Sequence, residues 1–292
     1  MKIVTHSGRF HTDEVFSCAA LSLLNKDNVS IVRSRDPEVW ATANVLVDVG
    51  GEYDASQMKF DHHQAGGAGG RENGIPYSSF GLVWKHYGVA LAGSEEIARA
   101  VDERLVQPID AGDSGVETFS VLDETAPYLL QDVIGIFAPM WDEKNRTEDE
   151  GFFEVLEIAK KILVRAIVQA KSMNAGRLIV EEAYNNAKDK RIVLLEGQFP
   201  WHQAMSSHPE PLYVVLPERG ETGRWRVEAV RKVPHTFQYR KNMPIEWAGK
   251  QNEDLAKITG VADAAFCHNH RFIAVAGSKE GAIKMATLAA NA

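Results

Sequence analysis

Two polar clusters near the N-terminus combine residue types that could bind metal ions and support phosphoester hydrolysis. Histidine and carboxylate side chains without cysteine suit Mn²⁺, Mg²⁺, Zn²⁺ or Fe²⁺. The candidate residues lie at the ends of short apolar runs, and they are His6, His11, Asp13, Asp48, Asp61, His62 and His63. Because an α/β sheet presents the residues at its strand ends to one cleft, the set predicts a two-metal hydrolytic site.

Asp48 is the best candidate for a ligand shared by two ions. It lies in the apolar run of residues 44–49, where a carboxylate is costly unless it is paired or bound to metal. A two-metal site needs a bridging carboxylate of this kind. His63, next to His62, is placed to protonate a leaving group or to contact a phosphate. The residues expected to take part in the reaction are Asp48, Asp61 and His63.

The residue that completes the site is left open between Asp110 and Asp113. Either carboxylate could bind metal, and either could equally cap a loop. Asp13 raises a similar alternative, because an acid in the first turn of a helix is favoured by the helix dipole. The neighbouring His6 and His11 favour a role for Asp13 in the site.

The elements that must position these residues predict an α/β fold. Residues 3–5, 29–32 and 44–49 are apolar runs typical of strands, and they alternate with helical patterns, which favours a doubly wound, mainly parallel sheet. Residues 151–188 predict one long helix, with a possible break at 174–176. The later pattern is rich in strands. We therefore expect a catalytic domain over 1–150, a connecting helix over 151–189 and a smaller C-terminal α/β domain over 190–292.

Composition and charge limit the function further. The chain has 292 residues, two cysteines and a net charge of −8, which argues against a protein that coats nucleic acid non-specifically. No apolar run is long enough to span a membrane, and the sparse cysteines suit a reducing cytoplasm. Basic residues gather in segment 219–241. The candidate substrate contacts from the C-terminal domain are Arg231, Lys232, His235, Arg271 and Lys279.

The motifs resemble a known family. Asp61-His62-His63 is the signature of the DHH phosphoesterase superfamily, and the closer resemblance is to the melanocyte-proliferating-gene (MYG) family, also labelled metal-dependent protein hydrolases. The resemblance covers essentially the whole chain. Its motifs are His6-Ser7-Gly8-Arg9-Phe10-His11-Thr12-Asp13-Glu14-Val15, Val47-Asp48-Val49-Gly50, Phe60-Asp61-His62-His63-Gln64, Ile109-Asp110-Ala111-Gly112, Pro234-His235-Thr236-Phe237-Gln238 and Gly277-Ser278-Lys279-Glu280-Gly281-Ala282.

The resemblance implies a set of ligands and a reaction. The implied metal ligands are His6, His11, Asp13, Asp48, His62 and Asp110, and His63 would face the substrate phosphate. The wider superfamily has two aspartates after its first histidine, whereas His11 stands in place of the first one here, as in the closer family. Eukaryotic members of that family are described as 3′–5′ RNA exonucleases. Nothing in these residues resembles a peptidase motif.

We therefore expect a phosphodiester hydrolase with two divalent ions, Mn²⁺ first among them. The leading hypothesis is a 3′–5′ exonuclease that acts on single-stranded RNA or short oligonucleotides. Trp225, Phe237 and Tyr239 could stack on bases, although each could equally belong to the core. One alternative is a small-molecule phosphatase or pyrophosphatase, and another is a non-catalytic sensor of metal or nucleotide. The long helix also makes a homodimer plausible.

Overall fold

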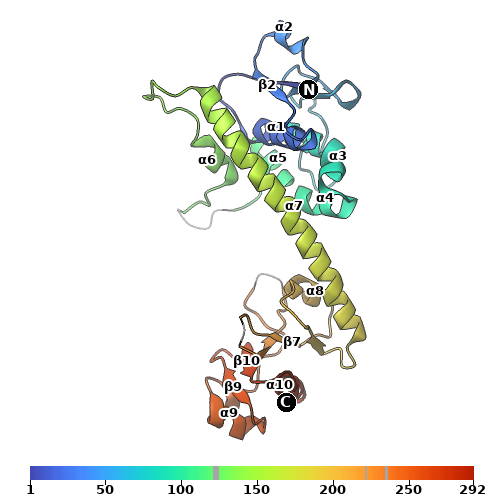
Figure 1. The fold of residues 1–292 in the computed structure, drawn as a ribbon, viewed down its shortest axis with the longest axis vertical. Helices are drawn as coiled ribbons and strands as arrows, with labels where there is room; N and C mark the ends of the chain where they lie inside the picture. Colours follow the sequence, from blue (N-terminus) through green and yellow to red (C-terminus); the bar gives the residue numbers. More distant parts are fainter. Residues whose placement is uncertain (121–124, 221, 234–235) are drawn as a thin grey trace. The chain divides into compact units, whose positions relative to one another are not determined.

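The computed structural model describes residues 1–292 with the exception of 121–124, 221 and 234–235. The chain divides into two compact units, Met1–Lys171 and Ser172–Ala292, and each is described by itself (Figure 1). Helix α7 (Glu148–Asn186) contributes residues to both units. Within the described residues, no helix has the length and apolar character needed to cross a lipid bilayer.

The first unit is built on a mainly parallel sheet. Its strands are β1 (Lys2–Thr5), β2 (Ser30–Arg33), β3 (Val45–Val47), β4 (Tyr53–Asp54) and β5 (Lys59–Phe60). They lie in the order β2-β1-β3-β5-β4, and only β4 runs antiparallel to its neighbour. The buried apolar side chains of β1 and β3 are typical of central parallel strands. The predicted α/β class and parallel sheet are confirmed, and double winding stays a prediction.

Helices cover this sheet and build the core of the first unit. They are α1 (Thr12–Leu24), α2 (Pro37–Trp40), α3 (Ser79–Ala92), α4 (Glu95–Val101), α5 (Gln107–Asp113) and α6 (Leu130–Gly135). A short 3₁₀ turn, η1, covers Ala55–Gln57, and a π-helical segment, η2 (Asp102–Val106), joins α4 to α5. Helix α1 packs along α3. Phe16 from α1, Phe80 from α3 and Phe152 from α7 meet in one hydrophobic core.

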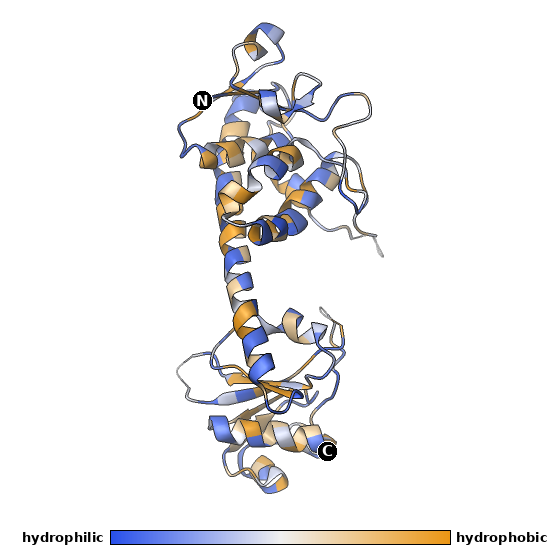
Figure 2. Ribbon diagram, turned by 90° about the vertical axis from the view of Figure 1, so that its right-hand side faces the viewer, coloured by the Kyte–Doolittle hydropathy of each residue, from blue (hydrophilic) through white to orange (hydrophobic). Residues whose placement is uncertain are grey.

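The long helix predicted over 151–188 is one continuous helix, and it begins three residues earlier than expected. Thr147 and Glu150 exchange backbone and side-chain hydrogen bonds that stabilise its start. The helix continues through Gly176, where a break was predicted. A Cβ atom at Gly176 would collide with the ring of Pro200, so this glycine permits close packing instead of ending the helix. Figure 2 shows apolar and hydrophilic positions recurring in turn along α7.

The second unit contains a mainly antiparallel sheet with both faces covered. Its strands are β6 (Ile192–Leu194), β7 (Tyr213–Pro217), β8 (Trp225–Ala229), β9 (Ala264–Cys267) and β10 (Ile273–Ala276), in the order β6-β7-β8-β10-β9. Alternate residues of β7 enter different cores: Tyr213 and Val215 pack with α10 (Lys279–Asn291). Val214 and Leu216 pack with α8 (Trp201–Ser207) and the end of α7. Helix α9 (Asn252–Thr259) and the 3₁₀ turn η3 (Ile245–Trp247) complete the unit.

Candidate metal centre

Three neighbouring parallel strands of the first unit end in polar residues. His6 follows β1, Asp48 follows β3, and the run Asp61-His62-His63 follows β5. Strands β1, β3 and β5 are adjacent and parallel, so their carboxyl ends lie at one edge of the sheet. This edge is where open α/β sheets commonly bind ligands. The structure therefore brings the predicted strand-end residues together.

Asp48 lies between two imidazoles. Its Oδ2 atom is 3.3 Å from Nε2 of His6, and its Oδ1 atom is 3.3 Å from Nε2 of His62. Ser79, at the start of α3, donates a hydrogen bond of 2.8 Å to the same Oδ1 atom. Asp48 has a φ of 57°, a left-handed conformation that aspartate tolerates better than most residues. The backbone thus aims one carboxylate at both histidines.

The surroundings of Asp48 strongly favour its charged form. The residue is only 4% exposed, and burial alone would raise the pKa of its carboxyl group. The close contacts with His6 and His62 and the hydrogen bond from Ser79 outweigh burial and hold the pKa of Asp48 well below its usual range. Burial lowers the pKa of His6, but its bonds to Asp48 and Glu14 raise that pKa to about 10. The acidic neighbours of His6 therefore favour its protonated form when no metal is bound.

The first turn of α1 adds more possible ligands. His11 is the N-cap residue, and Glu14 accepts hydrogen bonds of 2.8 Å from its backbone N–H. Glu14 also places Oε1 3.0 Å from Nε2 of His6. Ligand atoms of His6, His11, Glu14 and Asp48 all lie within 4.8 Å of one another. The sequence placed Glu14 in the first turn without a role in the site; the only local signal was its position three residues after His11.

Asp13 is the clearest sign that this cluster fits a metal ion. Its side chain is fully buried, and neither carboxylate oxygen has a hydrogen-bond partner among the described residues. Burial, together with the charges of Asp48 and Asp113, raises the pKa of Asp13 well above its usual value. A buried carboxylate without a partner is destabilising unless a proton or a cation compensates it. A divalent cation held by oxygen and nitrogen ligands would supply that compensation.

The structure brings Asp113, not Asp110, to the histidines. His62 Nε2 is 3.2 Å from Asp113 Oδ2, and ligand atoms of His11, Asp13 and Asp113 form another compact group. Asp110 is buried but belongs to none of the possible metal-binding groups found among the described residues. Its Oδ1 accepts hydrogen bonds from Ser78 and from the backbone of Gly81, and its Oδ2 is paired with Arg71.

Asp61 and His63 form a separate pair at the rim of the centre. The Nδ1 atom of His63 is 2.7 Å from Asp61 Oδ1 and 3.5 Å from Asp48 Oδ1. Asp61 is buried, and its Oδ2 accepts a hydrogen bond of 2.6 Å from the backbone of Gly51. The side chain of His63 is 61% exposed. Asp61 therefore orients His63 through one ring nitrogen while the ring remains open to solvent.

The predicted substrate contacts of the second unit do not form one cluster. Arg231 follows the end of β8 and Arg271 precedes the start of β10; since these strands are antiparallel with Glu228 opposite Ile273, both arginines lie at one sheet edge. Lys279 follows β10 at the opposite edge, where it lies over the ring of Trp225 and pairs with Glu196. Lys232 is exposed. His235 is outside the described residues.

Arg231 and Arg271 differ in the contacts that their guanidinium groups make within the unit. Arg271 donates a hydrogen bond of 3.1 Å to the carbonyl of Met243, which ties it to its own backbone surroundings. The guanidinium of Arg231 lies 5.6 Å from the ring of Phe237, whose side chain is 85% exposed. Tyr239 stacks on Phe272, and Trp225 packs beside the core. Phe237 is therefore the most accessible of the aromatic residues that the sequence singled out.

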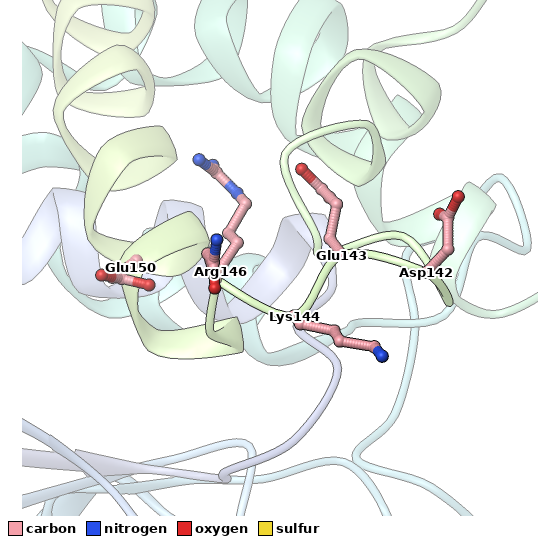
Figure 3. A pocket seen from close by; sticks show the side chains of 6 residues that line it. Asp142, Glu143, Lys144, Arg146 and Glu150 are labelled. Atoms are coloured by element: carbon pink, nitrogen blue, oxygen red, sulfur yellow. The ribbon is translucent and has the colours of Figure 1, made fainter.

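A polar pocket elsewhere in the first unit holds none of the predicted site residues. Its lining comes from the loop before α7 and the first turn of that helix: Asp142, Glu143, Lys144, Asn145, Arg146 and Glu150 (Figure 3). Arg146 pairs with Glu154 at 2.7 Å and donates to the carbonyl of Phe137. Glu150 accepts the hydrogen bond from Thr147 at the helix start. These groups shape the beginning of α7 and offer no second metal centre.

Comparison with known sequences identifies the family. The family model MYG1_exonuc, described as an uncharacterised protein family (UPF0160), matches residues 2–290. The chain belongs to this family. It is 31% identical to the MYG1 exonuclease of Mus musculus over 98% of this chain and 83% of the relative. It is 30% identical to the MYG1 exonuclease of Homo sapiens, with 98% and 84% covered.

Members of the family outside the animals are similar over nearly their whole length. The MYG1 protein of Dictyostelium discoideum is 33% identical, with 100% of this chain and 97% of the relative covered. A solved pGpG-specific phosphodiesterase from Vibrio aligns with 98% of this chain and 97% of its own. That alignment has a TM-score of 0.32 and 14% identity, so it carries no argument here. The family assignment rests on the sequence matches.

Proposed function

We propose that this protein is a metal-dependent phosphodiester hydrolase and acts as a 3′–5′ exonuclease on RNA or short oligonucleotides. The observation that carries the proposal is the centre in which Asp48 lies between His6 and His62 while the carboxylate of the buried Asp13 has no hydrogen-bond partner among the described residues. The exonuclease names of the mammalian relatives support the same reaction class. Histidine and carboxylate ligands at a sheet edge are suited to this chemistry.

The proposed ligands are distributed around Asp48. They are His6, His11, Asp13, Asp48, His62 and Asp113, with Glu14 available beside His6. This set keeps five of the six residues that the family resemblance implies and replaces Asp110 by Asp113. When bound here, two divalent ions would lower the pKa of a shared water and neutralise charge on phosphoryl oxygens. The mixture of nitrogen and oxygen ligands makes Mn²⁺ the first ion to test.

His63 is the residue proposed to handle the leaving group's proton. Asp61 binds the Nδ1 side of the ring at 2.7 Å, so the other nitrogen is left to meet a substrate. A protonated His63 can then donate from Nε2 to the departing oxygen, which is general acid catalysis. Asp61 fixes the orientation of the ring. Asp48 approaches the same ring nitrogen at 3.5 Å.

The second unit offers contacts for a nucleic acid strand at one edge of its sheet. Arg231 can bind a phosphate, and the exposed ring of Phe237 beside it can stack on a base of any sequence. Lys232 adds positive charge nearby. Stacking with local charge would let the enzyme hold a single strand without reading its sequence. We propose the remaining candidates, His235, Arg271 and Lys279, as weaker contributors.

A small-molecule phosphatase or pyrophosphatase is the second candidate. The observation that favours it is the net charge of −8, because extended nucleic acids are repelled by an acidic surface. The same centre could act on a compact phosphate ester without help from the second unit. Substrate length separates the two candidates.

The deciding experiment is hydrolysis of a 5′-labelled single-stranded RNA in the presence of Mn²⁺. We expect a ladder that shortens from the 3′ end and disappears with EDTA and with Asp48→Asn. Release of phosphate from nucleotides or pyrophosphate without a ladder would replace the exonuclease by the second candidate. Binding of Mn²⁺ without turnover of either kind of substrate would contradict the enzymatic proposal and favour a sensor.

A further inference from the structure

We propose that Arg71 is a positioning residue that holds Asp110 so that α5 presents Asp113 to the metal centre. On this inference Asp110 supports the centre without binding metal. The inference rests on the proposed function, since it concerns the same centre. Arg71, Asp102 and Asp110 form a cluster next to the proposed ligands.

Arg71 binds two carboxylates with three of its nitrogen atoms. Its Nε and Nη2 atoms donate to the two oxygens of Asp102 at 3.0 and 2.6 Å. Its Nη1 atom donates to Oδ2 of Asp110 at 2.7 Å. The side chain is 9% exposed, and the guanidinium lies 4.4 Å from the ring centre of Tyr77. Such a buried, fork-like arrangement fixes geometry in a way that lysine cannot reproduce.

The two carboxylates held by Arg71 lie at the start of an irregular helical segment and in the helix that follows it. Asp102 begins the π-helical segment η2, and Asp110 lies in the following helix α5. A π-helical turn changes the rotation of the helix that follows it, and such turns frequently occur at functional sites. Because Arg71 contacts the first residue of this segment and a residue of the helix after it, it fixes how α5 is rotated relative to the end of α4.

The rotation of α5 determines where Asp113 lies. Asp110 and Asp113 are three residues apart on one helix, so they belong to the same side of it. When Asp110 is held by Arg71, Asp113 lies 3.2 Å from His62. A change in the rotation or register of α5 would move both carboxylates together. Arg71 therefore acts on the centre through Asp110 and Asp113.

The start of α3 completes this arrangement. Asp110 accepts hydrogen bonds from the hydroxyl of Ser78 and the backbone N–H of Gly81, as an N-cap side chain would. A Cβ atom at residue 81 would collide with the carboxylate of Asp110, which explains the glycine. The adjacent Ser79 donates to Asp48. The same helix start thus contacts the central ligand and the residue that orients Asp113.

Charge gives Arg71 a second role. Asp110 is fully buried, and Asp13, Asp48 and Asp113 already place several carboxylates in the same region. Without Arg71, the carboxylate of Asp110 would be a buried charge with no cationic partner among the described residues around it. Removing one member of a buried ion pair is strongly destabilising for this reason. The role of Arg71 is therefore testable by removing the charge of Asp110 as well.

The test compares Arg71→Ala, Arg71→Lys and the double variant Arg71→Ala with Asp110→Asn. Arg146→Ala is the matched control, because Arg146 also forms an ion pair in this unit but is more exposed, at 29%, and belongs to none of the possible metal-binding groups among the described residues. Calorimetry measures Mn²⁺ affinity, and hydrolysis of bis(p-nitrophenyl) phosphate gives kcat and KM. We expect Arg71→Ala to weaken Mn²⁺ binding about 10- to 100-fold and to lower kcat with KM nearly unchanged. Arg71→Lys should give a smaller loss.

The double variant distinguishes a support from a ligand. If Asp110 only orients α5, removing its charge should restore part of the Mn²⁺ affinity lost in Arg71→Ala. If Asp110 binds metal, the double variant should bind Mn²⁺ more weakly still, and the inference would be overturned. Unchanged Mn²⁺ affinity in Arg71→Ala would overturn it too. The surface control should match the wild type in both measurements.

Two other variants and a separate measurement of hydrolysis cover the remaining outcomes. If Arg71→Ala does not fold, Arg71→Lys and Asp102→Asn take its place, and normal Mn²⁺ affinity in both would contradict the inference. Binding and hydrolysis also separate it from the proposed function. If the wild-type protein binds Mn²⁺ but cleaves no phosphodiester, the proposed function is contradicted. The Mn²⁺ affinities of the variants would still test the role of Arg71.

Discussion

The two sheets of this protein have five strands each but gather polar residues differently. In the first unit, β1, β3 and β5 are neighbours and parallel, so His6, Asp48 and His62 meet at one edge. In the second unit, β8 and β10 are antiparallel, so residues that follow these strands lie at opposite edges. Parallel strands place the residues that follow them at one edge of the sheet, whereas antiparallel strands distribute such residues over both edges. The candidate metal centre therefore gathers at one edge of the first sheet, whereas Arg231 and Lys279 lie at opposite edges of the second.

The largest effect should come from Asp48, the residue on which the parallel edge converges. Asp48→Asn removes a charge that lies between His6 and His62, so we expect activity to fall to the level of EDTA-treated protein. Phosphodiester hydrolysis with Mn²⁺ measures this. Asp54→Asn is the control, because Asp54 lies in β4 of the same sheet and, among the residues that the structure describes, its side chain binds only the neighbouring Ser56 and Gln57. Comparable losses of activity in both variants would contradict the claim that the ends of the parallel strands carry the reaction.

His63 should show the next largest effect. We expect His63→Gln to lower kcat about 100-fold, because the variant lacks a group that can donate a proton to the leaving oxygen. A substrate with a good leaving group, such as bis(p-nitrophenyl) phosphate, should lose much less, since it needs little protonation. Equal losses on both substrates would assign His63 to phosphate binding instead. Steady-state kinetics on the two substrates gives the answer.

The pH dependence of metal binding follows from the charges gathered at the parallel edge. In the metal-free protein the pKa of His6 is raised to about 10, and that of Asp13 is raised well above its usual value. Both side chains therefore tend to bind a proton, and a metal ion must displace that proton to bind there. We therefore expect Mn²⁺ affinity to rise with pH below the pKa of His6, by up to about tenfold per pH unit for each proton displaced.

Calorimetry in buffers with different ionisation enthalpies would count the protons released. Affinity that stays constant between pH 6 and 8, with no proton release, would contradict a role for these two residues as ligands. The control is Asp54→Asn, which should show the same pH dependence as the wild type.

The smallest effect should come from Arg231 and Phe237, which lie close together at one edge of the second sheet. Arg231→Ala and Phe237→Ala should raise KM for RNA several-fold, because the variants lose a phosphate contact and a stacking surface. Hydrolysis of bis(p-nitrophenyl) phosphate should be unchanged. Lys257→Ala, on the exposed side of α9, serves as the control for loss of one positive charge. Equal losses in Arg231→Ala and Lys257→Ala would indicate only general electrostatics, and an unchanged KM in Phe237→Ala would contradict the stacking contact.

Much of the fold was predictable because local patterns match the elements. The recurrence of apolar residues predicted α7, and its start differed because Thr147 and Glu150 cap the helix before residue 151. The apolar runs before His6 and Asp48 predicted the strands that carry them. The two-residue strands β4 and β5 leave too little pattern to define their pairing. Their order depends on contacts distant in sequence.

The sequence by itself determined which residues could form the centre, because apolar runs that end in histidine or aspartate mark the ends of buried strands. The tertiary structure decided which carboxylate reaches the histidines. Asp110 and Asp113 are the same residue type, three positions apart in one helix. Which of them reaches the histidines depends on the π-helical turn and on Arg71, which is 39 residues away from Asp110. The same holds for Glu14 and for the opposite edges of the second sheet. Residue type sets the available chemistry, while helix rotation and strand direction determine which groups meet.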